Sequence, residues 1–185
     1  MHRQVLTVAL LSLLLSASAA GAKVFSYPAL NCRCEIPNSW FFQSKLGYLL
    51  YVVDSDHKRG FWLRACPFGS DANQKSILLK RLDILQETNG FVIISKDEIT
   101  LHGTLFYEES WVKDMGNRSL YSTVYFAVAR NVGYLMGISK FEGNPADDEE
   151  LKAIIASFDL IDPNYFPSEI PSAVPPPVAP ANELD

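Results

Sequence analysis

Strand-forming segments fill most of the chain between residues 32 and 141, and this pattern limits the possible folds more than any other feature. Runs rich in β-branched and aromatic residues, separated by turn residues, predict strands. The predicted strands cover residues 32–36, 47–53, 61–66, 91–95 together with 98–102 as one strand, 104–113, 119–129 and 134–141. The second and third of these form a hairpin with a long polar loop.

Helical periodicity occurs in two places. The first predicted helix is capped by Ser70 or Asp71 and ends at Asn89-Gly90, because Gly suits the left-handed position after a helix. Its apolar residues recur at spacings of four and three, at Leu78, Leu82 and Leu85.

The second predicted helix begins at Asn144, with Pro145 in the first helical position and acidic residues in the first turns. Its apolar stripe contains Leu151, Ile154, Ile155 and Phe158. The order of strand, hairpin, helix, four strands and helix predicts an α+β sandwich with an antiparallel sheet, not a βαβ nucleotide fold.

The chain divides into three regions. Residues 1–22 combine a basic start, a short apolar run and the small residues Ala20-Gly21-Ala22, which is typical of a secretory signal peptide. The folded α+β domain is expected over residues 23–162. Seven of the eleven prolines lie in residues 163–185, which predicts an extended, disordered tail acting as a spacer, a polyproline ligand or neither.

Charge argues against nucleic acid as a partner. Without Arg3 the mature chain carries 15 basic and 21 acidic residues, which gives a net charge of −6. Binding to nucleic acid or to anionic membranes needs basic patches. No second apolar run of membrane-spanning length follows the leader, so we expect no stable membrane insertion after cleavage and a periplasmic or extracellular location.

The three cysteines allow one disulfide in an oxidising compartment. Cys32 and Cys34 alternate along one strand, so they point to one face and are poorly placed to bond each other. The disulfide candidate therefore joins Cys66 to Cys32 or Cys34. The alternative is that all three are small buried hydrophobic residues.

Several short motifs give the chain a resemblance to the PsbP-like proteins. The strand that ends in Cys34-Glu35-Ile36-Pro37 and is followed by Asn38-Ser39-Trp40 resembles the opening of that family. The closing segment, which ends in Ser157-Phe158, resembles the family's C-terminal helix. The resemblance covers about residues 24–161.

This resemblance implies a central antiparallel sheet flanked by two main helices. Members of the family include an extrinsic subunit of the photosynthetic oxygen-evolving complex, a Ran-binding import factor, bacterial envelope proteins and chaperone-like adaptors. Most of them bind another protein, and the family has no shared catalytic motif. A fold with several roles does not fix one function.

Catalytic motifs are absent from the sequence: there is no G-x-S-x-G elbow, no H-E-x-x-H and no P-loop. The best polar cluster is Asp54, Asp56 and His57, whose oxygen and nitrogen atoms are possible ligands of a divalent cation. The same residues are also common in an ordinary hairpin loop.

Aromatic residues supply the other candidate site. Trp40, Trp62 and Trp111 are expected near a surface or groove, and tryptophan is enriched at binding hot spots. The alternative is ordinary core packing. The sequence thus predicts an exported, non-enzymatic accessory protein that binds an unknown protein partner without a cofactor. The alternative is an envelope protein that binds a small ligand or a divalent metal.

Overall fold

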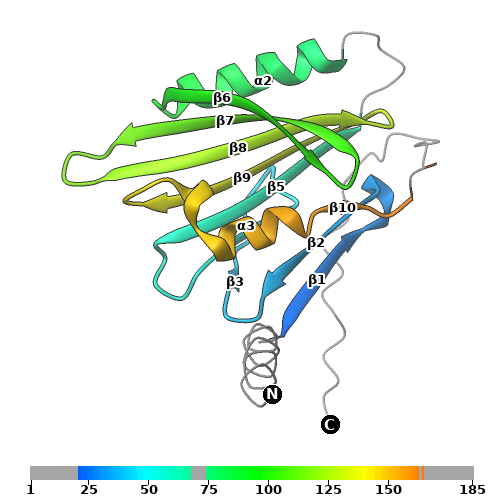
Figure 1. Cartoon of the computed structure of the whole chain (residues 1–185), viewed down its shortest axis with the longest axis horizontal. Coiled ribbons are helices and arrows are strands. Elements are labelled where there is room, and N and C mark those ends of the chain that lie inside the picture. The colour runs from blue at the N-terminus through cyan, green and yellow to red at the C-terminus, as the bar shows by residue number, and fades with distance from the viewer. Residues whose placement is uncertain (1–20, 68–73, 163, 165–185) are drawn as a thin grey trace, which may run out of the picture.

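Two antiparallel sheets make up most of the computed structural model, which describes residues 21–67, 74–162 and 164 (Figure 1). The larger sheet has seven strands in the order β3-β4-β5-β9-β8-β7-β6. Its strands are β3 (Phe41–Phe42), β4 (Leu50–Val53), β5 (Arg59–Pro67), β6 (Val92–Leu101), β7 (Thr104–Asp114), β8 (Ser119–Ala129) and β9 (Val132–Phe141). The predicted hairpin is β4 paired with β5.

A smaller sheet joins the two ends of the described chain. It contains β1 (Ala22–Tyr27), β2 (Cys32–Pro37) and β10 (Asp159–Leu160), in the order β1-β2-β10. The turn between its first two strands is a short 3-10 helix, η1 (Pro28–Leu30). The sequence predicted β2 alone; β1 and the two-residue strands β3 and β10 were missed.

The two α-helices lie on opposite faces of the seven-stranded sheet, so the predicted α+β class is confirmed. Helix α2 (Gln74–Thr88) packs Leu78 and Leu82 against one face. Helix α3 (Glu149–Ala156) lies against the other face, beside β2 (Figure 1). We call the α2 side the groove face and the α3 side the closed face.

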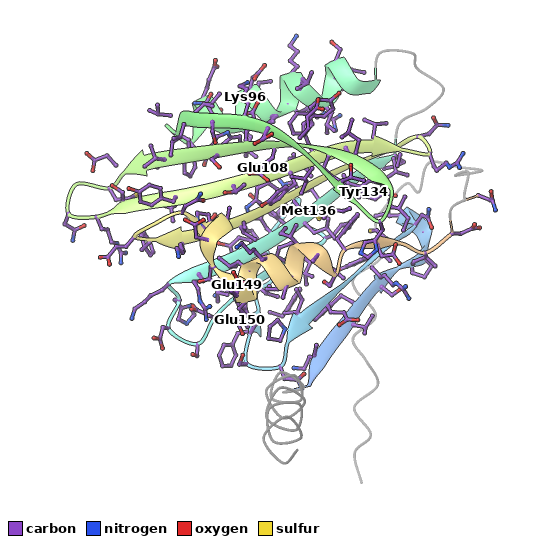
Figure 2. The ribbon with its side chains drawn as sticks, viewed as in Figure 1. Lys96, Glu108, Tyr134, Met136, Glu149 and Glu150 are labelled. Atoms are coloured by element: carbon purple, nitrogen blue, oxygen red, sulfur yellow. The ribbon has the colours of Figure 1, made fainter. Side chains whose placement is uncertain are left out.

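The closed face holds the larger hydrophobic core. Tyr134 is fully buried there, its ring contacts Phe158, and its hydroxyl donates a hydrogen bond to the backbone oxygen of Leu30 at 2.8 Å. Figure 2 shows Tyr134 and Met136 of β9 in the middle of the molecule, near α3. Because α3 and the smaller sheet both cover this face, its apolar side chains are shielded from water.

The start of the last helix differs from the sequence prediction. Asn144 caps a 3-10 turn, η2 (Pro145–Asp147), and a second cap, Asp148, begins α3 by accepting a hydrogen bond from the Leu151 amide. Two capping side chains four residues apart divide the segment into two short helices. The predicted apolar stripe is correct, because its four members are buried.

The predicted strand over 91–95 and 98–102 is β6, which continues through Lys96 and Asp97 and has a bulge between Ile93 and Ser95. The cap of the first helix at Ser70 or Asp71, nearly all of the leader and most of the tail lie outside the described residues. Within the part that the structure describes, no helix has the length and apolar character needed to cross a bilayer.

Candidate functional site

A cavity of about 430 Å³ opens on the groove face, next to the C-terminal end of α2. Leu85 and Asn89 line it from the α2 side, and the strands β4, β5, β8 and β9 form its base. Its aromatic lining consists of Tyr48, Tyr51, Trp62, Phe91, Trp111 and Phe141. The volume falls within the range of about 300–1,000 Å³ that is common for ligand pockets.

Gly137 shapes the floor of this groove. Trp62 on β5 faces Gly137 on β9 in the strand register, and a Cβ atom on Gly137 would lie 2.2 Å from Cε2 of the indole. The missing side chain therefore lets the indole lie across the neighbouring strand. An isolated Gly within a strand often marks such a close approach.

Trp111, the second indole of the floor, is held by a buried carboxylate. Its Nε1 donates a hydrogen bond to Oε2 of Glu109 at 3.1 Å. Lys96 of the edge strand β6 pairs with the other oxygen of Glu109 at 2.6 Å. Because both carboxylate oxygens have partners, the acid is satisfied in its buried position and fixes the orientation of the indole.

Cationic side chains stand over the aromatic rings at the groove. Lys45 Nζ lies 4.9 Å from the Tyr48 ring centroid and 4.3 Å from that of Tyr51. The guanidinium carbon of Arg64 lies 3.9 Å from the Tyr48 centroid. Tyr48 also makes an edge contact with Trp62 at 5.7 Å between ring centroids. The groove therefore combines apolar rings with positive charge at one end.

The three predicted tryptophans fall on different faces of the sheet. Trp62 and Trp111 line the groove, although they are only 9% and 2% exposed. Trp40 is 4% exposed and belongs to the closed-face core, so it does not join the other two in the groove. Strand order, which sequence alone did not supply, determines which face each indole occupies.

The predicted metal cluster does not assemble. Asp54 is buried and accepts hydrogen bonds from Nε of Arg59 and from the backbone amides of Lys58 and Arg59. Asp56 is exposed and pairs with Lys58 at 3.4 Å, while His57 has a positive φ of 55° in the same turn. Among the described residues no group of three His, Cys, Asp or Glu side chains has a geometry that could hold a metal ion.

Asp54 is a structural anion that holds the β4–β5 loop. Burial acts to raise its pKa, but the hydrogen bonds from Arg59 and the two amides outweigh burial and hold the pKa below its usual value. Arg59 also reaches Asp148 at 3.3 Å and Glu150 at 2.8 Å, which ties the loop to the start of α3. Asp54 therefore has a packing role, while His57 and Lys58 of the same loop line the groove.

The disulfide candidate is also wrong for this structure, in which Cys32, Cys34 and Cys66 are free thiols. Cys32 and Cys34 are buried in the closed-face core, and burial raises the pKa of Cys32 to about 12. Cys66 points to the groove face, where Nη1 of Arg81 in α2 lies 2.9 Å from its sulfur. The seven-stranded sheet separates the two positions.

Residues that the sequence did not single out complete the site. Lys45, Tyr48 and Tyr51 line the groove from the segment before β4 and from β4 itself. Gly137 offered a signal, because it interrupts an otherwise apolar strand. Lys45 offered none, because its position over the rings depends on how the loop folds back on the sheet.

Comparisons with known proteins identify the fold. No family model matches the sequence, and no curated protein matches it. The structure is similar to cyanobacterial PsbP from Synechocystis, with 12% identity and a TM-score of 0.54 over 78% of this chain and 95% of that one. It is equally similar to the Ran-binding protein Mog1p of Saccharomyces cerevisiae, with 11% identity and a TM-score of 0.54 over 78% and 97% of the two chains.

A third similar structure comes from Bacteroides thetaiotaomicron, with 15% identity and a TM-score of 0.55 over 75% of this chain. This chain spans about half the length of that protein, because the match covers 48% of it. At these identities the similarities show the fold alone. The chain has the PsbP/Mog1-like α+β fold that its motifs resembled.

Proposed function

We propose that this protein is a non-enzymatic accessory module that binds a partner protein through the groove face. The observation that carries the proposal is the aromatic groove itself, a cavity of about 430 Å³ beside the end of α2 with the largely buried Trp62 and Trp111 in its floor. Aromatic side chains with cations at the edge are the usual composition of protein-binding hot spots. The Ran-binding activity of Mog1p, which has the same fold, supports a protein partner.

Exposed apolar side chains next to the groove extend this surface. Leu46 is fully exposed in the loop that precedes β4, and Phe41 is 56% exposed on the edge strand β3. Phe41 lies opposite Val53, which lines the groove, so it shares the groove face. Clustered apolar exposure beside a preformed groove is typical of an interaction surface.

Export is part of the proposal and is supported by the sequence of residues 1–22. The partner is then a protein of the cell envelope or its surroundings, and the proline-rich tail is a spacer or a secondary ligand. Mass spectrometry of the protein isolated from its source tests whether the signal peptide is cleaved and the protein exported. A mature chain that begins at Lys23 supports export, and a retained Met1 contradicts it.

Site-specific photo-crosslinking tests the binding surface. A benzophenone side chain replaces Gln43 or Asn89, which are exposed and line the groove, or Asn38 or Lys152, which are exposed elsewhere. Irradiation in the source cells should give the same partner adduct from both groove positions and none from the control positions. Adducts from the control positions alone, or from no position, would refute the proposal.

A further inference from the structure

Lys45, which lines the groove, and Arg64, which lies over the ring of the groove residue Tyr48, differ from Arg59 in their ion pairing. Arg59 pairs with three carboxylates, those of Asp54, Asp148 and Glu150. Within residues 21–67, 74–162 and 164, Lys45 and Arg64 make no ion pair, and both stand over the Tyr48 ring instead. A ring face attracts a cation without neutralising it, so both charges can still pair with an anion.

The Nε atom of Arg64 gives a second, independent indication. It is buried and has no hydrogen-bond partner among the described residues. A buried donor without a partner costs about 1–3 kcal/mol, and more when the group is charged. A ligand does not reach this buried atom, but the Nη atoms of the same half-buried side chain have no hydrogen-bond partner among the described residues, and a carboxylate is well matched to the planar guanidinium group.

We propose that the groove recognises an acidic, extended segment of the partner protein. This inference rests on the proposed function and specifies its partner: carboxylates of the segment pair with Lys45 and Arg64, and adjacent apolar side chains lie on Trp62 and Trp111. The formal charge of the whole chain is −5, so these unpaired cations are a local exception to an acidic molecule. Charge complementarity of this kind sets partner choice and association rate.

A protein segment fits the groove better than other anions do. The lining combines aromatic rings with basic side chains and, within the described part of the chain, contains no carboxylate, which suits a chain that alternates apolar and acidic side chains. Nucleic acid is disfavoured because the phosphate backbone needs many basic contacts and the chain as a whole is acidic.

Peptide display tests the inference. A library of random dodecapeptides is selected on the full chain, and enriched peptides are then measured by fluorescence anisotropy. We expect Asp and Glu next to aromatic or aliphatic residues, and roughly tenfold weaker binding when each acid is replaced by its amide. Binding should also weaken as salt is raised, because the contacts lie at the groove edge.

Charge variants test whether Lys45 and Arg64 are the residues that bind the acidic side chains of the peptide. Lys45→Glu should weaken the selected peptide roughly fivefold to tenfold, whereas Lys45→Arg should retain binding. Lys23→Glu is the matched control, because Lys23 is exposed on β1 of the smaller sheet, against the closed face. Arg64→Lys should weaken binding too, because an ammonium lacks the guanidinium fork.

The outcomes separate this inference from the proposed function. Enrichment of neutral or basic peptides, no enrichment, or equal losses from Lys45→Glu and Lys23→Glu would overturn the acidic segment. If crosslinking from Gln43 and Asn89 still yields one partner in that case, the protein-binding function stands and only the ligand chemistry is wrong. If crosslinking also yields nothing, both fail.

Discussion

The two faces of the seven-stranded sheet are built from alternate residues of the same strands, yet they differ in what covers them. The closed face lies under α3 and the smaller sheet, and its core includes residues from β1 to Phe158. The groove face has α2 over only part of its width and leaves about 430 Å³ open beside the helix. One face is closed by packing, and the other keeps an open cavity.

The chemistry of the two faces follows from this difference in cover. On the closed face, the Tyr134 hydroxyl has a protein partner, whereas the buried Nε1 of Trp40 has none among the described residues. On the groove face, Lys45 contacts aromatic rings and has no carboxylate partner among the described residues. Incomplete packing and unpaired charge occur together, as expected where a ligand completes the structure.

The largest effect is expected on the closed face. Phe158→Ala removes a ring that contacts both Phe106 and Tyr134, so we expect a loss of about 3–5 kcal/mol in the free energy of unfolding. Urea denaturation measures it. Phe41→Ala, on an exposed edge strand, is the control and should change stability by less than about 0.5 kcal/mol. Similar losses in the two variants would contradict the assignment of the core.

Gly137→Ala tests the packing of the groove face, where the Trp62 indole lies over this residue. The added Cβ would overlap the Trp62 indole, so we expect a loss of about 2–3 kcal/mol and a displaced tryptophan. Gly60→Ala is the matched control, because its Cβ meets only ordinary contacts at 3.6 Å. Denaturation and tryptophan emission check both variants. An unperturbed Gly137→Ala protein would show that the indole does not lie over this residue.

Asp54→Asn tests whether this carboxylate is structural. We expect a loss of about 1–2 kcal/mol near pH 7, because the charged acceptor of three hydrogen bonds is removed. The folded pKa of Asp54 lies below its usual value, so its contribution is present above about pH 4 and is lost as pH falls through the folded pKa. The difference between Asp54→Asn and the parent protein should therefore shrink in acid.

Denaturation of both proteins at several pH values measures this difference. Asp56→Asn, which removes an exposed carboxylate from the same loop, should have little effect at any pH. A loss in Asp54→Asn that does not depend on pH would contradict the charge-based explanation.

Reaction with a thiol reagent compares how accessible the cysteines of the two faces are, without any substitution in the protein. In the folded protein a thiol reagent should modify the half-buried Cys66 first, while Cys32 and Cys34 stay protected by the closed-face core. The denatured, unreduced protein should show three free thiols. A single free thiol after denaturation would instead establish the disulfide that the sequence suggested.

Elements with local signals were predictable from the sequence. Alternation gave β8, the Leu78 and Leu82 spacing gave α2, and the stripe from Leu151 to Phe158 gave α3. The strand β1 pairs with its sequence neighbour β2 and was simply overlooked, whereas β10 was missed because its pairing joins Leu160 to Cys32 across most of the chain. No local pattern reports such a contact.

The candidate site was predictable only in part. The sequence indicated tryptophans, and two of the three do line the groove. It did not separate Trp40 from Trp62, because period-two alternation gives faces within a strand but not which faces of distant strands coincide. Asp54 and Asp56 look equivalent in sequence, yet one is buried against Arg59 and the other is exposed.

Fluorine NMR of the full chain labelled with 5-fluorotryptophan shows which face binds a ligand, because the three indoles sample both faces. Single Trp→Phe variants assign the three resonances. On addition of the peptide selected by display, the Trp62 and Trp111 resonances should shift together while that of Trp40 should not move. A shift of Trp40 alone, or no shift at saturating peptide, would contradict binding at the groove face.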